Sequence, residues 1–127
     1  MNKAIINEEI TWAYDALEKT GIAENGKIIK TYRGQISTFG AAVTMGSLLP
    51  AIAFFSEDAK SSVNRSKLMS AILYVLKQKD SSINVKSLFE HARQMKKSGD
   101  EGRCKEDILN AAIALKLAMN LYELEEN

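Results

Sequence analysis

Apolar side chains recur at intervals of three and four residues along most of this 127-residue chain. Such intervals place side chains on one face of an α-helix. The chain has one proline and seven glycines, so little interrupts long helices. The second helix is expected to begin near Asn25-Gly26. The pattern predicts helices with apolar faces over residues 6–17, 28–43, 50–55, 68–76, 85–95 and 105–124.

No segment alternates apolar and polar residues between hairpin turns, so no sheet is expected. Hydrophobic residues make up 46% of the chain, which is enough for one core. There is no internal repeat and no linker that would divide two domains. The sequence therefore predicts an all-α fold: a compact single-domain bundle of five to six helices over residues 1–127.

The overall charge does not indicate a class of partner. Seventeen basic and sixteen acidic side chains leave a net charge of +1, although a local basic patch is compatible with that balance. The only cysteine, Cys104, cannot form an internal disulfide and suits a reducing compartment. The most apolar stretch, residues 46–55, is about half as long as a bilayer span. We expect a soluble, cytoplasmic protein.

The residues that usually carry catalysis are sparse. His91, the only histidine, lies about 120° from the centre of its helix's apolar face on a helical wheel, so a surface histidine is expected. Cys104 falls near a predicted helix start, which can lower a thiol pKa, but with no histidine nearby an incidental cysteine is expected. The acidic pair Glu8-Glu9 lies beside polar residues and is expected in solvent. We predict no catalytic residue, no metal ligand and no cofactor.

Two predicted helices carry more apolar or small surface than one core requires. The last helix has a second apolar strip, so it is either central in the bundle or covered by a partner. The second helix has small residues spaced by three, four and three, which let another backbone approach, from this domain or from another subunit. The predicted protein interface consists of Gly34, Ser37, Ala41, Thr44, Ile113, Leu117 and Leu121.

Basic residues gather in two places, on the first turns of the second helix and along the fifth. Each cluster either neutralises phosphates, without regard to base sequence, or forms a solvated helix face. Cations near a helix C-terminus also complement its dipole. The candidate contacts to an RNA backbone are Lys27, Lys30, Arg33, Arg93, Lys96 and Lys97.

Three short segments carry a family resemblance. Lys30-Thr31-Tyr32, followed by Gly46-Ser47-Leu48-Leu49-Pro50-Ala51-Ile52-Ala53-Phe54, resembles the small subunit of the type III-B CRISPR effector, the Cmr complex. The segment Ala111-Ala112-x-x-Leu115-Lys116 is similar to that family's final helix. Pro50 and Ser47 depart from the family pattern at the turn.

The resemblance implies a compact helical subunit without nuclease or cyclase chemistry, which belong to other subunits. Several copies would stack into a filament beside the subunits that carry the guide RNA, and would line the channel for target RNA. Guide–target pairing would supply sequence recognition, while protein supplies shape and charge. The expected partners are therefore other effector subunits, copies of this chain, guide RNA and target RNA.

Two other functions are compatible with the sequence. A helical adaptor or regulator would bind protein alone, through the last helix and the small-residue row. A small enzyme would use His91, and would lose activity in His91→Ala.

Overall fold

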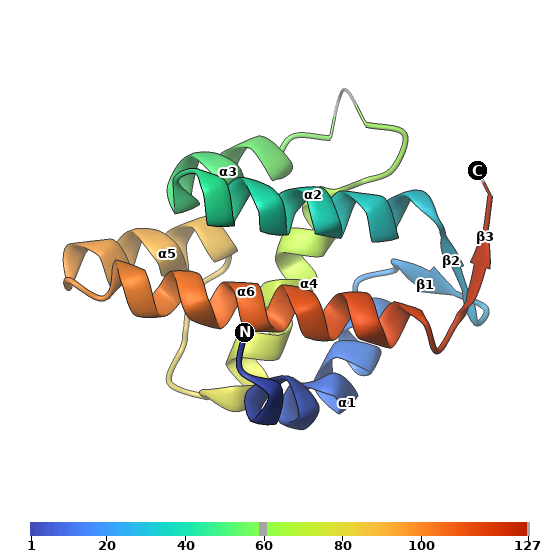
Figure 1. Cartoon of the computed structure of the whole chain (residues 1–127), viewed down its shortest axis with the longest axis horizontal. Helices are drawn as coiled ribbons and strands as arrows, with labels where there is room; N and C mark the ends of the chain where they lie inside the picture. Colours follow the sequence, from blue (N-terminus) through green and yellow to red (C-terminus); the bar gives the residue numbers. More distant parts are fainter. Residues whose placement is uncertain (59–60, 127) are drawn as a thin grey trace.

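The computed structural model describes residues 1–58 and 61–126. Within them the predicted helical bundle is confirmed, with a very small sheet at one end (Figure 1). The elements in chain order are α1 (Lys3–Lys19), β1 (Ala23–Glu24), β2 (Lys27–Ile29), α2 (Thr31–Met45), α3 (Leu48–Phe55), α4 (Ser66–Lys79), α5 (Leu88–Lys97), α6 (Glu101–Met119) and β3 (Glu123–Glu125).

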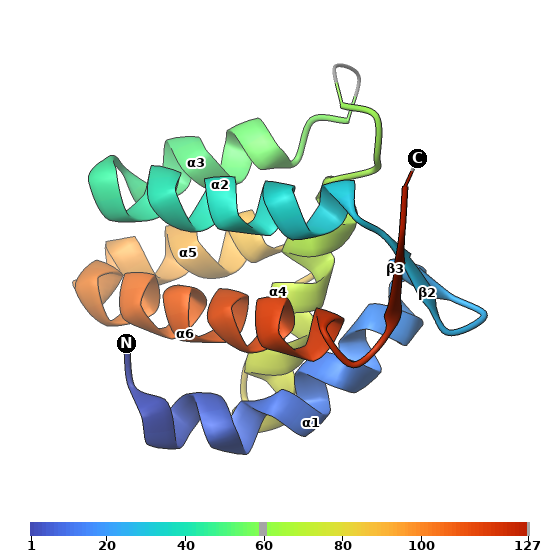
Figure 2. The ribbon, with the colours of Figure 1, turned by 45° about the vertical axis from the view of Figure 1, so that its right-hand side comes forward.

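The helices form three layers joined by one crossing helix. Figure 2 shows α2 and α3 in the upper layer, α5 and α6 in the middle and α1 below, with α4 running across them. Helix α6 packs against α1, α2, α4 and α5. It is therefore the central helix of the bundle, which accounts for most of its apolar surface. None of the helices in the described residues is both long and apolar enough to cross a membrane.

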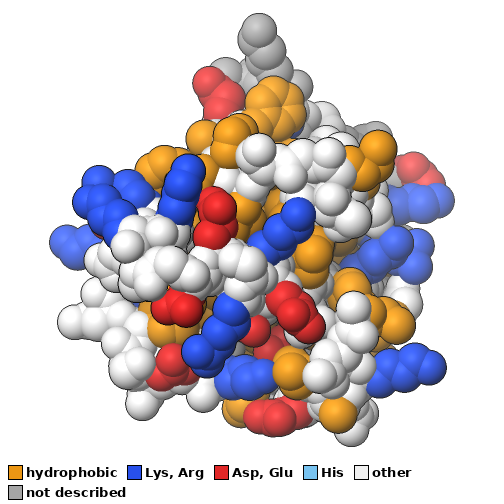
Figure 3. Space-filling view, turned by 60° about the vertical axis from the view of Figure 1, so that its left-hand side comes forward, with side chains coloured by type: hydrophobic (Ala, Val, Ile, Leu, Met, Phe, Trp, Pro, Cys, Tyr) orange, Lys and Arg blue, Asp and Glu red, His pale blue; other side chains and the backbone are white. Residues whose placement is uncertain are grey.

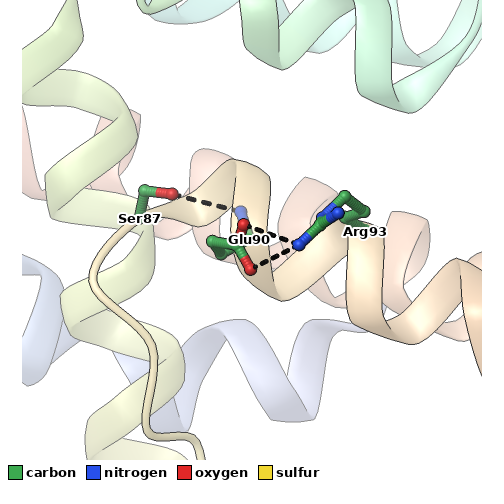
Figure 4. Close-up of polar contacts among 3 residues, drawn as sticks. All are labelled: Ser87, Glu90 and Arg93. Atoms are coloured by element: carbon green, nitrogen blue, oxygen red, sulfur yellow. Dashed lines mark hydrogen bonds and ion pairs between the residues drawn. The ribbon is translucent and has the colours of Figure 1, made fainter.

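Local sequence explains where several helices begin. The Asn2 side chain accepts a hydrogen bond from the Ile5 amide at 3.2 Å and caps α1. The Ser87 hydroxyl caps α5 in the same way, by accepting from the Glu90 amide at 3.1 Å (Figure 4). The interruption predicted at residues 46–50 is shorter in the structure, because α3 starts at Leu48 and Pro50 fits within its first turn.

The absence of a sheet was a wrong prediction. Asn25 and Gly26 both have positive φ, 55° and 77°, as a two-residue hairpin turn between β1 and β2 requires. Strand β2 pairs antiparallel with β1 and parallel with β3. These strands are only two or three residues long, too short to show an alternating pattern.

The sheet and a tight turn also shift two predicted helix boundaries. The second helix begins at Thr31 instead of near Asn25, because the hairpin occupies the residues between. The last helix covers Glu101–Met119 instead of residues 105–124. It begins earlier in the chain than predicted because the turn after α5 takes up only residues 98–100, where Gly99 has a φ of 84°. It ends earlier than predicted because the chain leaves the helix after Met119 and turns into β3.

Candidate functional site

A groove between α2 and α6 brings the two predicted interface segments together. We call it the α2–α6 groove; it has a volume of about 250 Å³. From α2 it is lined by Ile36, Ser37, Gly40 and Thr44, and from α6 by Leu109, Ala112, Ile113 and Lys116. Two members of the predicted small-residue row, Ser37 and Thr44, thus lie beside Ile113 of the predicted apolar strip.

The α2 side of this groove is shallow because α2 buries most of its large side chains against the core. Tyr32, Ile36, Phe39 and Val43 face the core, whereas Gly34, Ser37, Ala41 and Thr44 are all exposed. The hydroxyls of Ser37 and Thr44 donate to the carbonyls of Arg33 and Gly40, at 3.2 and 2.8 Å. These local bonds satisfy the donor groups of both hydroxyls. A partner that covers this face of α2 therefore does not have to supply hydrogen-bond acceptors for them.

Four predicted interface residues do not line the groove: Gly34 and Ala41 lie elsewhere on α2, and Leu117 and Leu121 follow Ile113 in the chain. Leu117 is 44% exposed and lies one turn beyond Ile113. Leu121 is 65% exposed but follows the end of α6, so it does not continue the helical strip as predicted. The exposed apolar surface of this helix therefore centres on Ile113 and Leu117.

The first basic cluster is arranged differently from the prediction. Only Arg33 lies in the first turn of α2; Lys27 is on β2 and Lys30 immediately precedes the helix, because the sheet occupies this part of the chain. Lys27 and Lys30 are exposed and Arg33 is half-buried. The Lys30 ammonium lies 3.6 Å from Glu126 in an exposed ion pair, which contributes little stability.

The second basic cluster lies on α5 as predicted, and Arg93, Lys96 and Lys97 are all exposed. The Arg93 guanidinium binds both Glu90 oxygens, at 3.0 and 3.2 Å (Figure 4). Its charge is therefore already matched within the helix. Lys96 and Lys97 lie in the last turn, where they complement the helix dipole.

The two basic clusters do not form one surface. In Figure 1, β2 and the start of α2 lie at the opposite end of the molecule from α5. Figure 3 looks onto the end that carries α5, where basic and acidic side chains intermingle with apolar patches. Any single strand of RNA that touches both clusters must therefore pass along the length of the molecule.

His91 is buried, with 8% of its surface exposed, so the prediction of a surface histidine was wrong. Its helix packs on α3, α4 and α6, and these neighbours cover a position outside the helix's own apolar stripe. Burial lowers the His91 pKa, against the opposing pull of Asp107 and Asp80. His91 borders a cavity of about 720 Å³ with both carboxylates and Arg103.

The acidic neighbours of His91, Asp80 and Asp107, could not be predicted from the residues next to it in the sequence. They come from the end of α4 and from α6, which are distant in the chain. In the described part of the chain, no side-chain hydrogen bond joins His91 to Asp80 or Asp107. Burial favours the neutral form of the imidazole, and an oriented catalytic dyad would require such a bond.

Cys104 is fully buried. Burial, with a smaller contribution from Asp107 and Glu101, raises the pKa of its thiol to about 11. The thiol is therefore protonated at neutral pH, which does not fit the reactive cysteine considered from the helix start. Among the described residues, no group of three or more His, Cys, Asp or Glu side chains is placed to hold a metal.

Glu9 is a buried carboxylate that sequence reasoning missed. It is 1% exposed, and one carboxylate oxygen lies 3.7 Å from the Lys79 ammonium. Its other oxygen and the side-chain nitrogen of Asn110 are buried without a hydrogen-bond partner among the described residues. Burial raises the Glu9 pKa to about 7, although Lys79 opposes this shift. The expectation that both Glu8 and Glu9 lie in solvent was wrong for Glu9.

Comparison with known proteins does not assign this chain to a family. No protein-family model, curated protein or solved structure matches it. The resemblance carried by Lys30-Thr31-Tyr32 and residues 46–54 therefore stays a prediction. In the structure, Tyr32 is buried and residues 46–54 form the turn into α3 and most of that helix.

Proposed function

We propose that this chain is a non-catalytic small subunit of a type III-B CRISPR RNA-guided effector complex, which acts in the cytoplasm in antiviral defence. In this role it stacks with copies of itself into a filament. It also contacts other subunits and the backbones of guide and target RNA. The resemblance supplies the family, and the surfaces of the molecule supply the support for a packing role.

The observation that carries the proposal is the α2–α6 groove. Small exposed residues on α2 let a partner helix approach its backbone closely, while Ile113 and Leu117 of α6 offer apolar area to cover. Covering such area is favourable, at about 25 cal/mol per Å². We assign this groove to a second copy of the chain, because a filament needs a contact that every copy repeats.

The six basic residues fit an RNA role that is shared between copies. Lys27, Lys30 and Arg33 lie at one end of the molecule, and Arg93, Lys96 and Lys97 lie toward the other. In a filament, the second cluster of one copy would approach the first cluster of the next. Lysine and arginine contacts to phosphates would then follow one strand without reading its sequence.

A charge placed next to the groove tests the packing role. Ala41→Arg and Leu117→Arg each introduce a bulky cation at an exposed position beside the groove. Thr11→Arg makes the same change in charge at an exposed position on α1 and serves as the control. We expect both groove variants, but not the control, to lose self-association in sedimentation velocity and to drop out of the reconstituted effector.

Normal assembly of both groove variants would contradict the proposal. The alternative, an adaptor that binds protein alone, is favoured by the same apolar lining of the groove. It predicts that partners remain bound after nuclease treatment and that charge changes in both basic clusters have no effect. The RNA-guided assignment predicts the opposite for each measurement.

A further inference from the structure

A second groove, away from the α2–α6 groove, lies between α4 and the segment that leads into α5. We call it the α4–α5 groove; its volume is about 380 Å³. Ser70, Tyr74 and Lys77 of α4 line one side, and Lys86 and Ser87 line the other. Leu73 contributes to an apolar part of the wall. All its described lining residues are serine, lysine, tyrosine, leucine or methionine, so none of them is acidic.

Carboxylates lie near this groove, but none forms an ion pair with its two lysines, Lys77 and Lys86, in the described part of the chain. Asp58 lies at the edge of the groove, where it accepts hydrogen bonds from the amide and hydroxyl of the lining residue Ser66 at 2.9 and 2.7 Å, but it forms no ion pair with either lysine in the described ranges. Glu90 is held by Arg93 on the adjoining turn (Figure 4). Two lysines therefore face one concave surface with their charges available to an anion.

A hydroxyl donor and an aromatic ring complete the groove. The Ser87 oxygen accepts from the Glu90 amide, which leaves the hydroxyl proton to donate to a ligand. Lysine binds phosphate as a mobile point charge, so a pair of lysines tolerates the varied geometry of a nucleic-acid backbone. Tyr74 is half-buried and lies one helical turn from Lys77. Cations beside an aromatic platform are the usual composition of a single-strand binding groove.

We infer that the α4–α5 groove binds single-stranded RNA, with Lys77 and Lys86 against backbone phosphates and Tyr74 against a base. The inference deepens the proposed function and rests on it for RNA as the source of the phosphates. It adds a contact surface outside the two basic clusters. A free phosphate would make the same contacts with the lysines but has no base to place against Tyr74. Substitution of Tyr74 therefore distinguishes RNA from free phosphate as the ligand.

The test measures binding of fluorescent oligouridine to the full chain by anisotropy, at several salt concentrations. Lys77→Gln and Lys86→Gln should each weaken binding and reduce the salt slope by about 0.7, and the double variant by about 1.4. Lys19→Gln removes one exposed lysine elsewhere, on α1, and should leave both values unchanged. Thermal unfolding of each variant verifies that it is folded.

A second arm tests the aromatic contact. Tyr74→Leu should weaken oligouridine binding roughly 5- to 150-fold, whereas Tyr74→Phe should retain it, because only the ring is needed for stacking. Duplex RNA should bind more weakly than oligouridine because its bases are already stacked. Inorganic phosphate should compete only at far higher concentration than the oligonucleotide.

Three results would overturn the inference: no oligouridine binding, a salt slope unchanged in the double variant, or equal losses in Lys19→Gln. A full effect of the lysines with none of Tyr74→Leu would also overturn it, by identifying a site for simple phosphate. These failures are distinct from failure of the proposed function. If the proposed function is wrong, the chain does not assemble with effector subunits, whether or not the α4–α5 groove binds RNA.

Discussion

Replacement of Glu9 by glutamine is expected to stabilise the protein at neutral and alkaline pH. Glu9 is almost fully buried, and its only ion-pair partner among the described residues, Lys79, is 3.7 Å away and partly exposed. Solvent therefore screens part of the attraction, while the carboxylate pays the full cost of leaving water. Glutamine has nearly the same shape and keeps polar atoms at this position without a charge.

The magnitude follows from the shift in pKa. Burial raises the Glu9 pKa from 4.5 to about 7. Each unit corresponds to about 1.4 kcal/mol, so the difference amounts to roughly 3 kcal/mol. The folded protein holds the proton more tightly than the unfolded chain does. The Glu9 contribution to the free energy of unfolding is therefore complete below about pH 4.5 and is lost as the pH rises through about 7.

Urea denaturation at a series of pH values measures this effect. Between about pH 4.5 and pH 8, the wild-type protein should lose roughly 3 kcal/mol relative to Glu9→Gln. Glu8→Gln makes the same charge change at an exposed neighbour, and its pH profile should parallel that of the wild type. A Glu9→Gln protein that is less stable than the wild type at pH 8 would refute the reasoning, because the Lys79 pair would then outweigh desolvation.

Two further predictions concern the turn before α3 and the second basic cluster. A Cβ added at Gly46 would lie 2.9 Å from the Ala42 carbonyl oxygen, so Gly46→Ala should cost about 1–3 kcal/mol in denaturant unfolding. Gly34→Ala, in open space on α2, should instead stabilise by up to about 1 kcal/mol, and equal effects would contradict this contrast. Reversing the charges of Lys96 and Lys97 should weaken RNA binding in the assembled complex and lower the salt slope by about 0.7 per lost contact. Reversal at exposed Lys3 should leave the slope unchanged, and an unchanged slope in the cluster variant would argue against phosphate contacts there.

The helices could be predicted because amphipathic periodicity is a local signal that extends over several turns. The sheet could not, since β1 and β2 are too short to alternate and Asn25-Gly26 marks a hairpin turn as readily as a helix start. The end of α6 was overestimated because Tyr122 and Leu124 continue the apolar spacing. They contact the core from a turn and a strand instead.

The grooves and the surroundings of His91 were harder to predict than the helices, because they depend on how the helices pack together. The small-residue row on α2 was visible in the spacing, but its position beside Ile113 follows from the packing of α2 on α6. A helical wheel placed His91 outside its apolar stripe and took no account of the neighbouring helices that bury it. Lys77 and Lys86 meet across a groove only because the chain reverses between α4 and α5.

The central claim is that this chain acts by packing within an RNA-guided assembly. Purification of the tagged full-length chain from its native cells, with and without nuclease, tests it most directly. The account predicts that several copies of the chain are recovered together with the type III-B backbone subunits and guide RNA, and that nuclease treatment reduces the recovered assembly. Recovery of unrelated protein partners alone, unchanged by nuclease, would contradict it.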